Sequence, residues 1–153
     1  MRRESIMNMD RIYQKAMEEH REINVQIRRL KDKIRCGQGQ PSNQEELRDL
    51  VSELRSHLKE HFKIEEEGGF MTPVLEERPQ AESVVLHLKK EHEEILDQCD
   101  DIIQTLTSGS TSPEKLEGVC ETIKNLIQQL GSHEKQEDDL IQTVFVDEIG
   151  TKD

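Results

Sequence analysis

Apolar residues recur at alternating steps of three and four along four long stretches of this 153-residue chain, and this spacing restricts the fold more than any other feature. Steps of three and four place side chains along one face of an α-helix, whereas no stretch alternates with the period of two that a β-strand requires. The four stripes, polar interruptions included, are Ile6, Met9, Tyr13, Ala16, His20, Ile23, Ile27, Leu30 and Ile34; Leu47, Leu50, Leu54, His57, His61 and Ile64; Ala81, Val85, Leu88, His92, Ile95, Cys99, Ile102 and Leu106; and Leu116, Val119, Ile123, Leu126, Leu130, His133, Glu137, Leu140 and Val144. Each stripe must be buried against a partner, so the pattern predicts a helical bundle and argues against a disordered chain.

Turn and capping residues divide the chain into helices expected at about 5–35, 42–67, 79–106 and 113–145. Gly37 to Pro41 form the first break, Ser42 opens an S-x-x-E capping box, and Ser112 with Pro113 begins the last helix. The connection 68–78 is apolar enough to pack as a cap or as a short helical turn. Because short connections make sequential helices antiparallel, the expected fold is all-α: an antiparallel up-down-up-down four-helix bundle, with residues 1–153 as a single domain.

Charge and cysteine usage limit the partners and the compartment. The chain carries 33 acidic and 21 basic residues, a net charge of −12, which repels nucleic acid and anionic membrane surfaces. It has no apolar run near the roughly 20 residues that span a bilayer, and no apolar segment behind its two N-terminal arginines. Three scattered cysteines fit a reducing compartment. We therefore expect a cytoplasmic protein without nucleic-acid or membrane partners.

Polar residues interrupt the apolar stripes at matching heights. Each predicted helix carries one inward histidine: His20, His61, His92 and His133. A glutamate follows two of them one turn later, Glu65 after His61 and Glu137 after His133. A single histidine in an apolar stripe is usually a hydrogen-bonded core residue. Four of the six histidines on inward positions, joined by two carboxylates that are costly to bury unpaired, favour a shared metal layer instead.

The chemistry of these side chains limits the metal. Residues four apart project from the same helix face, so each histidine–glutamate pair can supply one nitrogen and one oxygen to an ion. Imidazole and carboxylate together suit iron, manganese or zinc. The lack of clustered thiolates argues against a structural cysteine zinc site or an iron–sulfur cluster.

The order His20, His61-x3-Glu65, His92, His133-x3-Glu137 resembles the hemerythrin-like (HHE cation-binding) family over nearly the whole chain. The resemblance implies a non-heme di-iron centre with oxo and carboxylate bridges in a four-helix bundle, with zinc or manganese as possible substitutes. By the same resemblance these six residues are the metal ligands, and Glu65 and Glu137 are the bridges.

Two positions depart from the oxygen-carrying hemerythrins. The carriers have a further histidine on the third helix where this chain has Leu88, and His87 lies about 100° away, within reach only through a π-bulge. Asp138 has the spacing of the carriers' last-helix aspartate, although Glu137 fits the stripe better. The chain thus resembles a divergent branch with four or five histidines and two glutamates. Fewer protein ligands leave positions open for water, O₂, peroxide or NO.

Other polar residues near the stripes have more than one interpretation. His57 is a fifth ligand, a partner of a ligand, or a polar residue at the rim of the core. Tyr13 either packs in the core or hydrogen-bonds towards the ligands. Glu66 is expected to belong to a solvated helix end, and Glu91 and Glu134 to point away from the centre.

Three functions remain open from the sequence. The first is a module that binds O₂ or NO, or senses or stores iron; the second is a di-iron enzyme that acts on peroxide or NO, or supports repair of iron–sulfur clusters. Repair proteins of this type often carry a cysteine-containing N-terminal segment, whereas this chain starts at its first helix, which favours binding over catalysis. The third is a metal-free interaction bundle in which the histidines only form hydrogen bonds.

Overall fold

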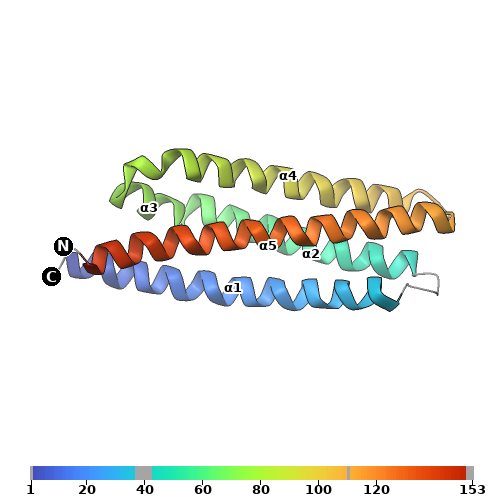
Figure 1. The fold of residues 1–153 in the computed structure, drawn as a ribbon, viewed down its shortest axis with the longest axis horizontal. Coiled ribbons are helices and arrows are strands. Elements are labelled where there is room, and N and C mark those ends of the chain that lie inside the picture. Colours follow the sequence, from blue (N-terminus) through green and yellow to red (C-terminus); the bar gives the residue numbers. More distant parts are fainter. Residues whose placement is uncertain (1, 37–42, 110, 151–153) are drawn as a thin grey trace.

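Four long α-helices lie where the apolar stripes predicted them (Figure 1). The computed structural model describes residues 2–36, 43–109 and 111–150, with the side chains of 10–34, 43–109 and 111–144. The long helices are α1 (Arg2–Cys36), α2 (Gln44–Glu67), α4 (Glu82–Thr107) and α5 (Pro113–Gly150). A short helix, α3 (Met71–Glu77), and a 3₁₀ turn, η1 (Pro79–Ala81), join α2 to α4 and confirm the helical character predicted for this connection.

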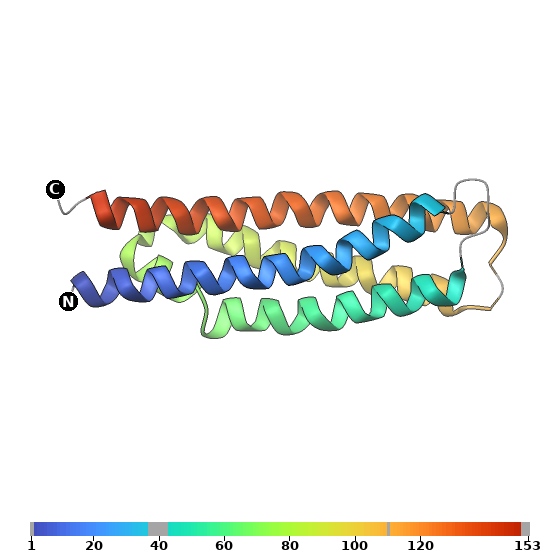
Figure 2. The ribbon, with the colours of Figure 1, turned by 90° about the horizontal axis from the view of Figure 1, so that it is seen from below.

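Each long helix packs chiefly against two others, in the order α1, α2, α4, α5 and back to α1. Sequential long helices run antiparallel, so the two ends of the chain lie at the same end of the bundle, beside α3 (Figures 1 and 2). The predicted all-α four-helix bundle is confirmed. Because the four helices surround a common axis, inward side chains at one height can meet.

Polar caps fix where α2 and α5 begin. The Asn43 side-chain oxygen accepts a hydrogen bond of 3.0 Å from the Glu46 N–H, which makes Asn43 the N-cap of α2. The predicted cap, Ser42, lies outside the described residues. At α5 the Ser112 hydroxyl accepts from the Lys115 N–H at 3.2 Å and Pro113 is the first helical residue, as the sequence predicted.

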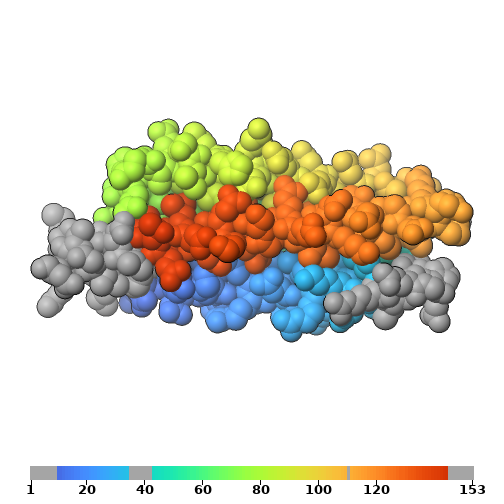
Figure 3. All heavy atoms as spheres, in the orientation of Figure 1, coloured from blue at the N-terminus to red at the C-terminus, as the bar shows by residue number. Residues whose placement is uncertain are grey.

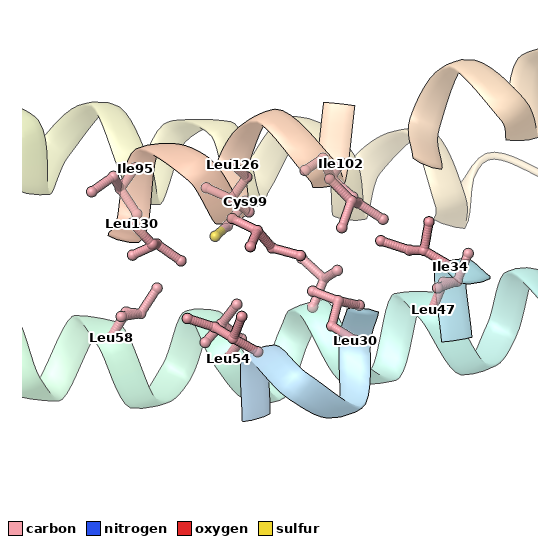
Figure 4. Close-up of a cluster of buried hydrophobic side chains, with 14 of the residues drawn as sticks. Leu30, Ile34, Leu47, Leu54, Leu58, Ile95, Cys99, Ile102, Leu126 and Leu130 are labelled. Atoms are coloured by element: carbon pink, nitrogen blue, oxygen red, sulfur yellow. The ribbon is translucent and has the colours of Figure 1, made fainter. Parts of the chain in front are cut away.

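The apolar core consists of two clusters separated along the bundle axis. The loop-end cluster lies towards the α1–α2 and α4–α5 connections, and its side chains from all four long helices point toward one another (Figure 4). The terminus-end cluster joins α3 to α1, α4 and α5 and comprises Ala16, Phe70, Met71, Val74, Ala81, Val85, Leu88, Ile141 and Val144. Within the described residues, no helix is long and apolar enough to cross a bilayer.

The predicted inward stripe of α2 was wrong at every second position. His57 and Leu50 are only half-buried and Ile64 is 36% exposed. The inward line instead comprises Leu47, Val51, Leu54, Leu58, His61, Phe62 and Glu65. Apart from Phe62, which follows His61 directly, both stripes follow steps of three and four, and they share three positions, so periodicity alone could not choose between them. Packing of α2 against both α1 and α4 makes the choice.

Candidate metal centre

A layer of six polar residues fills the bundle between the two apolar clusters. Each long helix contributes one histidine to it, and α2 and α5 each add a glutamate one turn further on. All six side chains belong to residues no more than 3% exposed, and these are the six predicted from the sequence: His20, His61, Glu65, His92, His133 and Glu137. Figure 3 shows one face of the bundle, on which α5 lies between α4 and α1.

The six residues form two overlapping groups. One comprises His20 and His61 with both glutamates, and the other comprises His92 and His133 with the same two glutamates. Within each group, one potential ligand atom per residue lies within 4.8 Å of all the others. Because both glutamates belong to both groups, each carboxylate is placed where it could bridge two ions.

The Nε2 atoms of all four histidines face the two carboxylates. His61 Nε2 lies 3.2 Å from Glu65 Oε2, and His20 Nε2 lies 3.2 Å from Glu137 Oε1. On the other side, Nε2 of His92 lies 3.2 Å from an oxygen of each glutamate, and Nε2 of His133 lies 3.1 Å from Glu137 Oε2.

Several of these inward atoms lack a hydrogen bond. Among the described residues, the buried atoms without a hydrogen-bond partner include Nε2 of His20, His61 and His133, both oxygens of Glu65, and Oε1 of Glu137. Buried polar atoms are nearly always satisfied, and those that are not call for a bound ion or another role. The donor set therefore fits metal ions: two imidazole nitrogens and two carboxylate oxygens face each position.

The opposite nitrogen of each of the four histidines lies against a carboxylate from a neighbouring helix. His61 Nδ1 lies 2.6 Å from Glu19, and His92 Nδ1 lies 2.7 Å from Glu66. The remaining two distances are 3.0 Å from His133 Nδ1 to Glu91 and 2.9 Å from His20 Nδ1 to Asp138. In His61, His92 and His133 the carboxylate accepts a hydrogen bond from Nδ1–H, which leaves Nε2 available for an ion.

These contacts correct three expectations. Glu66 is not merely a solvated residue, and Glu91 does not point away, because each carboxylate contacts a histidine of the layer. Glu134 is 9% exposed and also lies inside, and burial raises its pKa to about 7. Sequence reasoning did not single out Glu19. The available signal was position: Glu19, Glu66, Glu91 and Asp138 are each adjacent in sequence to one of the six inward residues.

The carboxylates change the proton affinity of the histidines. Burial opposes the charged imidazolium, but Asp138, Glu137 and Glu65 together outweigh it and raise the pKa of His20 to about 12. In the same way, the pKa of His92 rises to about 10 despite burial. Burial alone would raise the pKa of Glu137, but the close approach of His133, His20 and His92 lowers it well below its usual range. The layer is thus an anionic environment that favours cations, whether protons or metal ions.

The remaining candidates lie outside both groups. His57 Nδ1 lies 2.7 Å from Gln26 Oε1 on the rim between α1 and α2. The His87 side chain is 57% exposed, and α4 runs through this position without a π-bulge. Tyr13 is half-buried and packs against the terminus-end cluster. Asp138 contacts His20 Nδ1 but does not belong to either potential ligand group.

The two sides of the layer differ in what covers them. Phe62 stacks on His92, with ring centroids 3.9 Å apart and planes 9° apart, and meets His133 edge-on at 5.7 Å. On the side of α1, a hollow of about 80 Å³ reaches His61 and Glu65 and is walled in part by Ile12, Ala16, Ile64 and Phe70. Sequence reasoning had not assigned Phe62 a place in the site.

A four-helix bundle with two overlapping histidine and carboxylate groups in its core defines a metal-binding class of helical protein. Residues 11–145 match the family described as hemerythrin HHE cation binding domain, and the chain belongs to that family. The resemblance found in the sequence is thereby confirmed. Comparison with curated proteins and with solved structures gave no match.

Proposed function

We propose that the layer holds a non-heme di-iron centre. His20 and His61 bind one ion, His92 and His133 bind the other, and Glu65 and Glu137 bridge the two. The observation that carries this proposal is the membership of both glutamates in both four-residue groups, because a single-ion site would not need two groups that share their carboxylates. The unsatisfied buried atoms of the layer support it further.

Iron is the metal that the donor set and the family together favour. Imidazole nitrogen and carboxylate oxygen suit iron, and also manganese or zinc, which are the expected substitutes. Each position faces two nitrogens and two oxygens. Iron accepts more than four ligands, so a pair of iron ions would supply open positions and redox chemistry for a small molecule.

The dimensions of the site support a small ligand. The hollow of about 80 Å³ beside His61 and Glu65 has room for a few molecules of the size of water and none for a bulky organic substrate. Its partly apolar walls suit O₂ or NO, and peroxide is also small enough. We therefore propose a protein that binds O₂ or NO, or that senses or stores iron.

Metal analysis of the aerobically purified protein tests the centre. We expect about two iron ions per chain and a visible absorption spectrum. His61→Ala should lose metal and lower the melting temperature, because bound ions stabilise the folded state. The matched control is His57→Ala, one turn away on the same helix, which should retain the metal. Metal well below one ion per chain in the unmodified protein would exclude the proposal.

Ligand binding and turnover are then separated with the loaded protein. Addition of O₂ or NO should give a stoichiometric and reversible change in the absorption spectrum. Continuous loss of added NO or peroxide over many equivalents per chain would instead identify a di-iron enzyme. Equal ligand responses from the iron-loaded and metal-free proteins would place the binding elsewhere.

A further inference from the structure

The four carboxylates that contact the ligand histidines form a closed circuit around the bundle. Asp138 of α5 contacts His20 of α1, and Glu19 of α1 contacts His61 of α2. The circuit continues where Glu66 of α2 contacts His92 of α4, and it closes where Glu91 of α4 contacts His133 of α5. Every long helix thus receives one such contact and provides one.

The circuit follows from a repeated local arrangement. Each of the four carboxylates is adjacent in sequence to a residue that faces the ions: Glu19 to His20, Glu66 to Glu65, Glu91 to His92, and Asp138 to Glu137. Neighbouring residues on a helix point about 100° apart. When one residue points to the bundle axis, the next therefore points to the adjacent helix, where a ligand histidine lies.

Burial distinguishes these contacts from ordinary surface ion pairs. Exposed pairs contribute little, because water screens them and long side chains lose entropy. The imidazole rings here belong to side chains no more than 4% exposed, and the four carboxylate side chains are only 14–34% exposed. Through Nδ1, His61, His92 and His133 form hydrogen bonds of 2.6–3.0 Å, the separations of charge-assisted bonds. His20 Nδ1 and Asp138 Oδ1 lie 2.9 Å apart as an ion pair without hydrogen-bond geometry.

The circuit also adds negative charge around the centre. The four outer carboxylates and the two shared glutamates give six formal negative charges (4 + 2) around two ions. A carboxylate on Nδ1–H makes the imidazole a more basic ligand. The added negative charge and the more basic imidazoles both stabilise an iron ion more strongly when the charge of that ion is higher.

We propose that Glu19, Glu66, Glu91 and Asp138 are positioning residues that hold each ligand histidine with Nε2 toward the ions and make the centre favour ferric over ferrous iron. This inference rests on the proposed di-iron centre. It assigns the outer carboxylates two separable effects: they orient the imidazole rings, and their negative charge lowers the reduction potential of the iron.

Amide and alanine variants separate these two effects. In Glu19→Gln and Glu66→Gln the amide oxygen can still accept the Nδ1–H bond, so the iron content should stay near two per chain while the reduction potential rises. In Glu19→Ala and Glu66→Ala the support is lost as well, and metal affinity should fall about 10- to 100-fold. Redox titration and competition with a chelator measure the two quantities.

Neighbouring glutamates on the same helices provide matched controls. Glu18→Gln and Glu67→Gln remove one charge each from exposed positions and should leave both potential and affinity unchanged. If Glu19→Gln and Glu66→Gln have the same reduction potential as these controls, the proposed effect of the carboxylate charge on the potential is wrong. Unchanged metal affinity in both alanine variants would overturn the effect on orientation. Failure of the unmodified protein to bind iron would instead reject the proposed function itself.

Discussion

The loop-end cluster and the polar layer lie on the same four helices and use the same helical spacing, but burial stabilises the side chains of the cluster and is costly for those of the layer. In the cluster, side chains such as Leu54 and Leu126 each contribute about 1.5–3 kcal/mol by leaving water. In the layer, four imidazoles and two carboxylates are buried at a cost of several kcal/mol unless charge and coordination offset it. The cluster therefore carries the fold, and the layer uses part of that stability to hold ligands in place.

The largest effect is expected from a change in a shared carboxylate. Glu137→Gln removes a charge that faces both ions, and metal affinity should fall by more than the roughly 100-fold that loss of an outer partner costs. Metal analysis after dialysis measures this loss, and circular dichroism should still show a helical bundle. Asp139→Asn, an exposed carboxylate on the same helix, is the control and should retain metal. Two ions per chain in Glu137→Gln would contradict the bridging assignment.

The pH should affect the metal-free and iron-loaded proteins in opposite directions. The raised pKa values of His20 and His92 stabilise the metal-free fold fully below about pH 6.5, and this contribution is lost as the pH rises toward about 10 and 12. The lowered pKa of Glu137 stabilises the fold above about pH 4.5 and loses its effect in stronger acid. The metal-free protein should therefore be most stable between about pH 4.5 and about pH 6.5.

Iron binding should strengthen as the pH rises, because ions compete with protons for the Nε2 atoms. Thermal melting of both forms from about pH 5 to about pH 9 checks the comparison. The melting temperatures should diverge with increasing pH. Parallel curves for the two forms would show that the layer does not exchange protons for metal.

A cavity in the loop-end cluster should lower the stability of the fold without changing metal binding in the layer. Leu126 is fully buried, and Leu126→Ala should lower the free energy of unfolding by about 2–5 kcal/mol. It lies seven residues before His133 on α5, about 10 Å along the helix, so its effect should add to that of metal removal. Denaturant unfolding with and without metal measures the effect of the substitution and the effect of metal removal on the free energy of unfolding. Loss of iron from folded Leu126→Ala would show that the two regions are coupled.

The smallest effect is expected at the turn that follows α2. A Cβ atom on Gly69 would lie 2.8 Å from both Glu65 Cα and Ile64 O, so Gly69→Ala must displace backbone next to a shared carboxylate. We expect a loss of about 1–3 kcal/mol in stability together with weaker metal binding. Gly68→Ala meets no atom within 4 Å and should cost about 0.5 kcal/mol or less. Equal metal affinity in both variants would show that the turn does not position Glu65.

Most of the fold could be read from the sequence because helical periodicity is a local property. All eight residues of the third predicted stripe are buried, seven on α4 and Ala81 in η1, and the cap at Ser112 lies where it was predicted. The stripe on α2 was misassigned because two equally periodic lines exist there, and only the neighbouring helices decide which line is buried. The six inward polar residues were found because a buried polar residue interrupts an apolar pattern visibly.

The sequence by itself determined the helices, their antiparallel order and the identity of the six residues in the layer, since spacing along one helix fixes which side chains share a face. Tertiary structure alone decided which nitrogen of each histidine faces the carboxylates, which residues cover the layer, and that Glu19, Glu66, Glu91 and Asp138 close a circuit around it. These contacts join residues 26–118 positions apart in the chain, and no local pattern encodes them. They depend on the rotation of each helix about its axis, which only packing against two neighbours fixes.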